Sequence, residues 1–178
     1  MTTIEPGSIS RSQVHDGAHR PGALLQGVVL VVLVGANFVV GALGSLATRE
    51  AVDGWYADAE KVAWNPPDVV FGPVWSLLYV LMGVAAWLVW RRRGWAPARG
   101  ALTLYVVQLA FNAAWTPVFF EGRYAWLALA IIVVLLGLII ATIVAFRPHS
   151  RVAAWLLVPY AVWVAYATTL NLGIAVLN

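Results

Sequence analysis

The side chains of this chain that could do chemistry are tryptophans and uncharged amides, because every ionisable residue falls outside its long apolar segments. Trp75 and Tyr79 lie four residues apart in one such segment, so a helix would place them on one face. Gln108 and Asn112 have the same spacing in another segment, and Trp163 lies inside a third. Indole walls with a few amides suit the binding of a flat, large, mostly apolar molecule.

Ordinary catalytic and metal chemistry is not indicated by the residue types. There is no cysteine, and the three histidines are His15 and His19, before the first apolar segment, and His149, in a short connection. A catalytic zinc takes three protein ligands, so these histidines predict no metal site. We find no nucleophile–base–acid set, and we expect no tightly held cofactor. The lack of intramembrane charge argues against a proton pump, an ion channel with a charged filter or a carboxylate hydrolase.

The same neutral side chains have a simpler explanation that stays open. Amides in membrane helices, here including Asn37, often bond between helices, at about 1–2 kcal/mol or less per bond. Tryptophans near the ends of apolar segments often act as interfacial anchors. We expect that role for Trp87, Trp90, Trp95, Trp126 and Trp155. By contrast, Trp75, Trp115 and Trp163 lie deeper and share faces with other aromatic or amide side chains, which favours a pocket.

The elements that must position these residues are membrane-spanning helices. Of the 178 residues, 62% are hydrophobic and 11% are charged, whereas a soluble domain is roughly half apolar and about a quarter charged. Strand-like alternation is absent, so we predict an all-α membrane protein, an up-and-down bundle of five transmembrane helices in one domain. The predicted helices are 24–47, 69–90, 101–120, 124–146 and 152–177, after a polar tail at 1–23 that we expect to be disordered.

Basic residues divide unevenly between the two sides of this predicted bundle. The side that carries the N-terminus has eight of the eleven Lys and Arg residues, and the opposite side has three. If the bilayer is a cytoplasmic membrane, the positive-inside rule places the N-terminus in the cytoplasm and the long first loop, 48–68, outside. An outer membrane is the alternative location. The net charge of +3 thus indicates orientation, and we expect no nucleic-acid partner.

Three stretches carry a family resemblance. They are WNPPDVVFGPVWSLLYVLMG at 64–83, QLAFNAAWTPVFF at 108–120 and PYAVWVAYATTLN at 159–171. In this order they resemble the TspO/MBR family of tryptophan-rich sensory proteins and mitochondrial translocator proteins. The resemblance implies a usually dimeric five-helix protein with a ligand pocket near the first loop. It also implies a receptor or carrier that binds porphyrins, such as protoporphyrin IX, and isoquinoline carboxamide or benzodiazepine ligands.

The resemblance extends to individual site residues. Trp75 and Trp163 match tryptophans tied to light-dependent porphyrin breakdown in bacterial relatives, so they are the catalytic candidates if the protein is an enzyme. Trp55, Tyr56 and Asn65 match residues that cap the pocket. The implied ligand-binding residues are Gly41, Ser45, Trp55, Tyr56, Asn65, Phe71, Trp75, Tyr79, Asn112, Trp115, Trp163, Ala167 and Leu170.

Two departures from the family pattern bear on the first loop and on sterol binding. Val62 stands where relatives often have proline, so we expect a less rigid first loop. The final stretch, TLNLGIAVLN, lacks the tyrosine and basic residue of the sterol-recognition pattern, which makes sterol binding doubtful.

Three functions therefore remain open: ligand binding, light-dependent porphyrin degradation, and a role as a membrane interaction or scaffold protein. Ala110 and Ala114 have the small-xxx-small spacing of helix interfaces, which fits either a homodimer or packing within the protomer.

Overall fold

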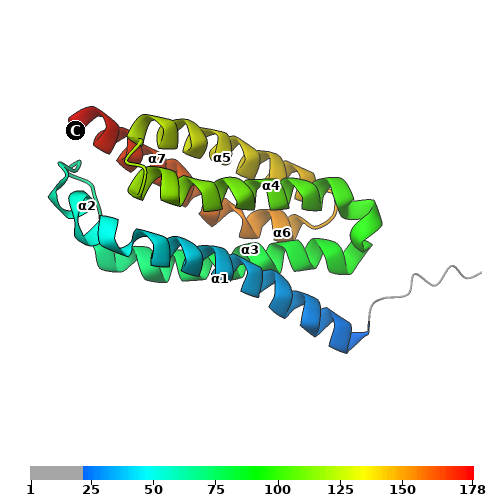
Figure 1. The fold of residues 1–178 in the computed structure, drawn as a ribbon. Helices are drawn as coiled ribbons and strands as arrows, with labels where there is room; N and C mark the ends of the chain where they lie inside the picture. The colour runs from blue at the N-terminus through cyan, green and yellow to red at the C-terminus, as the bar shows by residue number, and fades with distance from the viewer. Residues whose placement is uncertain (1–21) are drawn as a thin grey trace, which may run out of the picture.

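The chain folds into a bundle of antiparallel helices (Figure 1). The computed structural model describes residues 22–178, so almost all of the predicted tail lies outside the described residues. The elements are α1 (Ala23–Asp53), α2 (Trp55–Asp58), η1 (Asp68–Val70), α3 (Phe71–Arg93), α4 (Trp95–Phe120), α5 (Ala125–Phe146), α6 (Arg151–Leu156) and α7 (Val158–Leu177). Five spans among them are long and apolar enough to cross a membrane, and the described part has no strand. The predicted all-α class with five membrane-crossing helices is confirmed.

Two predicted connections are shorter than expected. The helix α1 continues to Asp53 rather than ending at residue 47, and α3 and α4 are separated only by Gly94 instead of a loop at 91–100. The apolar runs end where we placed them, but Arg and Glu are good helix formers and extend the helices into the polar region. Gly94 adopts φ 74°, a left-handed conformation that suits glycine and ends α3.

The fifth span is broken, although we predicted one continuous helix at 152–177. Leu157 separates α6 from α7, and Pro159 occupies the first turn of α7. Proline has no backbone N–H to bond the carbonyl four residues earlier, and its ring crowds that carbonyl, so a straight helix through this point is unfavourable. The first turn is the position where a missing N–H costs least.

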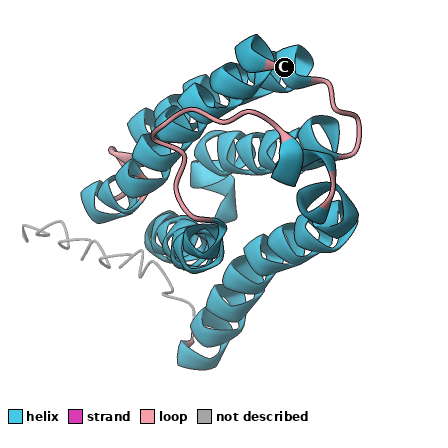
Figure 2. Ribbon diagram, turned by 90° about the vertical axis from the view of Figure 1, so that its left-hand side faces the viewer, coloured by secondary structure: helices cyan, strands magenta, loops and turns pink. Residues whose placement is uncertain are grey.

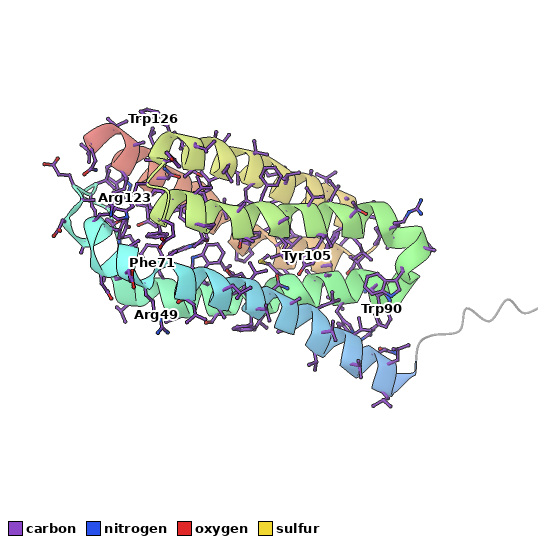
Figure 3. All side chains as sticks on the ribbon, viewed as in Figure 1. Arg49, Phe71, Trp90, Tyr105, Arg123 and Trp126 are labelled. Atoms are coloured by element: carbon purple, nitrogen blue, oxygen red, sulfur yellow. The ribbon has the colours of Figure 1, made fainter. Side chains whose placement is uncertain are left out.

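The tightly packed core occupies the half of the bundle nearer to the α3–α4 connection. Met82, Phe146 and Tyr160 are fully buried there. Trp90 is only 4% exposed, and its ring centroid lies 5.9 Å from that of Trp95. The prediction of Trp90 as an interfacial anchor is therefore wrong, because packing between α3 and α4 covers it. Figure 3 shows Trp90 at the end of the bundle opposite to Phe71.

A buried polar contact joins two helices inside this core. The Asn37 amide donates to the Tyr105 hydroxyl at 2.6 Å and to the Leu33 carbonyl at 2.6 Å. The interhelical explanation of Asn37 is therefore confirmed, and α1 is tied to α4 through it.

Candidate functional site

The other half of the bundle contains a cavity of about 470 Å³. Its walls come from α1, α3, α4, α5 and α7, and Val52, Tyr56 and Asp68 line it where α1, α2 and η1 meet. Figure 2 looks onto this end of the bundle and shows the loop from α2 crossing over it before returning to α3. The cavity therefore lies in the spans, beneath the longest connection of the described chain.

Aromatic side chains from several helices line the cavity. The Trp75 ring lies 5.4 Å from that of Tyr79, and the Trp163 ring lies 5.7 Å from that of Phe71 in a T-shaped arrangement. On α4, the Trp115 and Phe119 rings stack at 5.0 Å with 17° between their planes. The helical period of α3 and α4 aims these rings at a common space, which can take a flat apolar molecule between them.

The α1 wall is made of small residues that let the helices approach. A Cβ atom at Gly41 would overlap the ring of Tyr79, and one at Gly44 would lie 3.3 Å from the Thr116 side chain. Glycine at position 41 thus gives the Tyr79 ring room beside α1, and glycine at position 44 lets α1 approach Thr116 of α4. Ser45 continues this small-residue wall toward the cavity opening.

The amide groups of the cavity already have protein partners. Asn112 Nδ2 donates to the Tyr160 hydroxyl at 3.1 Å, and Trp115 Nε1 donates to Asn171 Oδ1 at 3.0 Å. Asn171 Nδ2 in turn donates to the Ala125 carbonyl at 2.9 Å. These bonds tie α4, α5 and α7 together around the cavity and leave it predominantly apolar. The buried Trp163 Nε1, by contrast, has no hydrogen-bond partner in the described structure.

Among the residues that line the cavity, the charged one is Asp68, at the opening. Burial raises the pKa of the Tyr56 phenol, and the negative charge of Asp68 raises it further. Lys61 Nζ lies 4.6 Å from the centre of the same ring. Because tyrosine normally ionises near pH 10, this phenol stays neutral at physiological pH. Described residues contain no cluster of three or more potential metal ligands.

Comparison with known proteins identifies the family of the chain. The TspO/MBR family matches residues 28–177 of the chain. The chain belongs to the TspO/MBR family. It is similar to human translocator protein, at 44% identity over 66% of this chain and 70% of the relative. It also resembles the tryptophan-rich protein TspO of Archaeoglobus fulgidus, at 37% identity over 84% and 96% of the two chains.

A third relative is the tryptophan-rich sensory protein of Cereibacter sphaeroides, at 41% identity over 78% of this chain and 88% of the relative. With its five apolar spans, this TspO/MBR protein is an integral, multi-pass membrane protein.

Most of the residues predicted for the site lie around this one cavity. The lining includes Gly41, Ser45, Tyr56, Phe71, Trp75, Tyr79, Asn112, Trp115, Trp163, Ala167 and Leu170. Their role in binding a ligand stays a prediction, because the structure shows their positions only.

Two predicted residues do not line the cavity. Trp55 faces the other side of α2 and donates from Nε1 to the Phe120 carbonyl at 2.8 Å. Asn65 bonds the neighbouring Pro66 carbonyl at 3.0 Å within the loop. Adjacent residues of a helical turn point in different directions, so only Tyr56 of the Trp55–Tyr56 pair contacts the cavity. The capping role of Trp55 and Asn65 stays a prediction.

Several lining residues were not predicted. Phe119 and Asn171 fall inside the matched stretches, so their spacing from Trp115 and Leu170 could have indicated them. Phe38 and Val52 lie outside those stretches, and Ile132 belongs to a uniformly apolar helix. The sequence around Phe38 and Ile132 does not distinguish them from lipid-facing residues, and Val52 falls within the predicted first loop.

Proposed function

We propose that this TspO/MBR protein is a membrane receptor or carrier that binds porphyrins, such as protoporphyrin IX, in the aromatic cavity. Isoquinoline carboxamide and benzodiazepine-type ligands would occupy the same space. The observation that carries the proposal is the convergence of Trp75, Trp115 and Trp163 from three helices on one apolar cavity. The role would be sensing, regulation or transport, with the ligand exchangeable rather than a resident cofactor.

The physical properties of the cavity support a flat apolar ligand. Its volume falls within the range of about 300–1,000 Å³ typical of small-molecule sites. The amides at its edge, Asn112 and Asn171, already donate to protein partners, so stacking on the rings would supply most of the affinity. The relatives' names, translocator protein and tryptophan-rich sensory protein, fit the transport and sensing roles.

Light-dependent degradation of bound porphyrin is a second candidate function. It is favoured by one observation, namely that Trp75 and Trp163 line the same cavity and would both contact its contents. Residues for ordinary acid–base catalysis are not gathered there, so the chemistry would depend on light absorbed by the porphyrin itself.

We further propose a cytoplasmic-membrane location and a homodimer.

A titration in the dark tests the binding proposal. The purified protein is titrated with protoporphyrin IX while tryptophan fluorescence is followed. We expect saturable quenching, and affinity lower by about three- to tenfold in Trp75→Phe, because an aromatic contact contributes about 0.5–1.5 kcal/mol beyond its buried area. Trp155→Phe is the matched control, since this indole is 72% exposed and does not line the cavity. Without saturable quenching, both candidate functions are wrong.

Illumination then separates the two functions. Loss of porphyrin absorbance that depends on Trp75 and Trp163 would support the degradation candidate. Equal loss in the double variant Trp75→Phe with Trp163→Phe would remove these indoles from any chemistry.

A further inference from the structure

A second concavity, of about 570 Å³, lies on the surface at the same end of the bundle as the cavity opening. We call it the outer groove. Its lining includes Trp55 of α2, Arg123 and Tyr124 of the connection between α4 and α5, and Trp126 of α5. Figure 3 shows Arg123 and Trp126 at this end, near the C-terminus of α7. None of these residues lines the aromatic cavity.

The outer groove and the cavity lie on two sides of the same residues. Adjacent residues face opposite ways, with Trp55 toward the groove and Tyr56 toward the cavity. Their rings are 5.9 Å apart and nearly perpendicular, at 86°. Ile174 contacts both spaces. A molecule held in the outer groove would therefore lie directly beside the opening of the cavity.

Arg123 is the charged group of the outer groove. Its guanidinium carbon lies 5.8 Å from the centre of the Trp55 ring, and no carboxylate of the described residues forms an ion pair with it. Its backbone is held in the left-handed region, at φ 54°, which is uncommon for a residue other than glycine. The turn is closed by bonds to α4, from Gly122 N to the Pro117 carbonyl and from Tyr124 N to the Val118 carbonyl. An exposed cation is thus placed over an indole by a defined turn.

The Arg123 guanidinium and the neighbouring aromatic rings suit a ligand that has both a carboxylate and a flat apolar body. A guanidinium presents paired N–H donors that match the two oxygens of a carboxylate. Tyr124 and Trp126 are 65% and 62% exposed beside it, and they offer aromatic faces to a flat molecule. A ligand with a carboxylate at one edge and a flat apolar body would satisfy both features.

We propose that the outer groove is a second binding site, which takes the carboxylate edge of a flat amphiphilic anion through Arg123. The inference rests on the proposed function, since the same porphyrins carry carboxylates. Anionic phospholipid shares the chemistry that Arg123 would recognise, so the experiment must distinguish the two sources.

The test compares protoporphyrin IX with its uncharged dimethyl ester on the full chain in phosphatidylcholine nanodiscs. We expect Arg123→Gln to weaken binding of the diacid by about tenfold, since charge-assisted hydrogen bonds are about twice as strong as neutral ones. Binding of the diester should stay unchanged. The diacid affinity of Arg123→Lys should lie between those of the unchanged protein and Arg123→Gln, because lysine keeps the charge but loses the paired donors. Arg49→Gln is the matched control, as Arg49 is exposed, lies outside both concavities and is placed away from Arg123 in Figure 3.

The outcomes separate this inference from the proposed function. Equal effects of Arg123→Gln and Arg49→Gln on the diacid would overturn the groove site, because charge alone would explain them. If Arg123→Gln weakens binding of the diacid and the diester equally, the groove site is overturned as well. The substitution would then have disturbed the structure of the turn rather than removed a contact with a carboxylate. If neither porphyrin binds saturably, the proposed function itself fails.

A second arm uses nanodiscs that contain phosphatidylglycerol. If Arg123→Gln changes only the number of retained phosphatidylglycerol molecules and leaves porphyrin affinity unchanged, the groove binds lipid headgroups and the porphyrin assignment is wrong. Retention of the tenfold effect in both lipid compositions would support the assignment.

Discussion

The Asn112 side chain donates a hydrogen bond of 3.1 Å to the Tyr160 hydroxyl, and this bond joins α4 to α7. Asn112 lines the cavity, whereas Tyr160 is fully buried in the core. One amide therefore serves both the packing of two helices and the wall of the proposed site. Interhelical bonding and pocket lining, which the sequence left as alternatives, coexist at this residue.

Asn112→Leu should lower both stability and ligand affinity. The change leaves the buried Tyr160 hydroxyl without its partner, which we expect to cost about 1 kcal/mol in the free energy of unfolding. Thermal unfolding in detergent measures the first effect and porphyrin titration the second.

Tyr160→Phe supplies the control for this bond. It should cost a similar amount of stability, and the double variant should cost less than the sum, because the two residues share one interaction. Strictly additive effects would show that the bond contributes nothing to folding.

Gly41→Ala should weaken ligand binding by displacing Tyr79. The added Cβ would overlap the Tyr79 ring, which lines the cavity and must then move. Gly35→Ala is a matched control on the same helix, because nothing lies within 4 Å of the added atom. Affinity should fall in the first variant only. Equal affinities would mean that the Tyr79 ring shifts without changing the site.

The sequence predicted the helices and the deep cavity wall because both depend on local, repeating features. Long apolar runs mark membrane spans, and helical spacing places Trp75 beside Tyr79. Trp163 was found for the same reason. Its position inside an apolar run and within a matched stretch both indicated the wall that it forms.

The errors arise where tertiary packing decides. Nothing near Trp90 in the sequence reveals that the chain reverses direction at a single glycine between α3 and α4. This reversal packs the Trp90 indole against Trp95. Likewise, the direction in which Trp55 points depends on a short helix that packs against Phe119 and Phe120. Contacts between distant segments cannot be inferred from apolar periodicity alone.

Substitution of Ala110 and Ala114 tests the predicted homodimer. Both residues are exposed on α4 and so are not used for packing within the described protomer. If this face forms the dimer, the double change to Leu should shift the protein toward monomer, since bulky side chains prevent close helix approach. Light scattering after size-exclusion chromatography measures the mass. Ala130→Leu, at an exposed position on α5, is the control, and an unchanged dimer in both variants would exclude this face.

The loop above the cavity, residues 59–67, is held along α7. The Tyr166 hydroxyl donates to the Trp64 carbonyl at 2.6 Å, and the Trp64 indole donates to the Thr169 hydroxyl at 3.2 Å. Val62 packs so closely on Gly173 that a Cβ atom there would overlap it. The valine that replaces the family's proline thus contributes a packing contact to the loop.

Tyr166→Phe should loosen this loop without unfolding the bundle. Loss of one bond of about 1 kcal/mol should speed ligand release by about fivefold, provided that the loop must move for the ligand to leave. Stopped-flow release of porphyrin measures the rate, and hydrogen exchange of residues 59–67 reports the loop directly. Trp155→Phe is the control, because this exposed indole lies outside both the cavity and the outer groove. Faster exchange of the loop with unchanged porphyrin release would show that the ligand leaves by another path, such as between the helices.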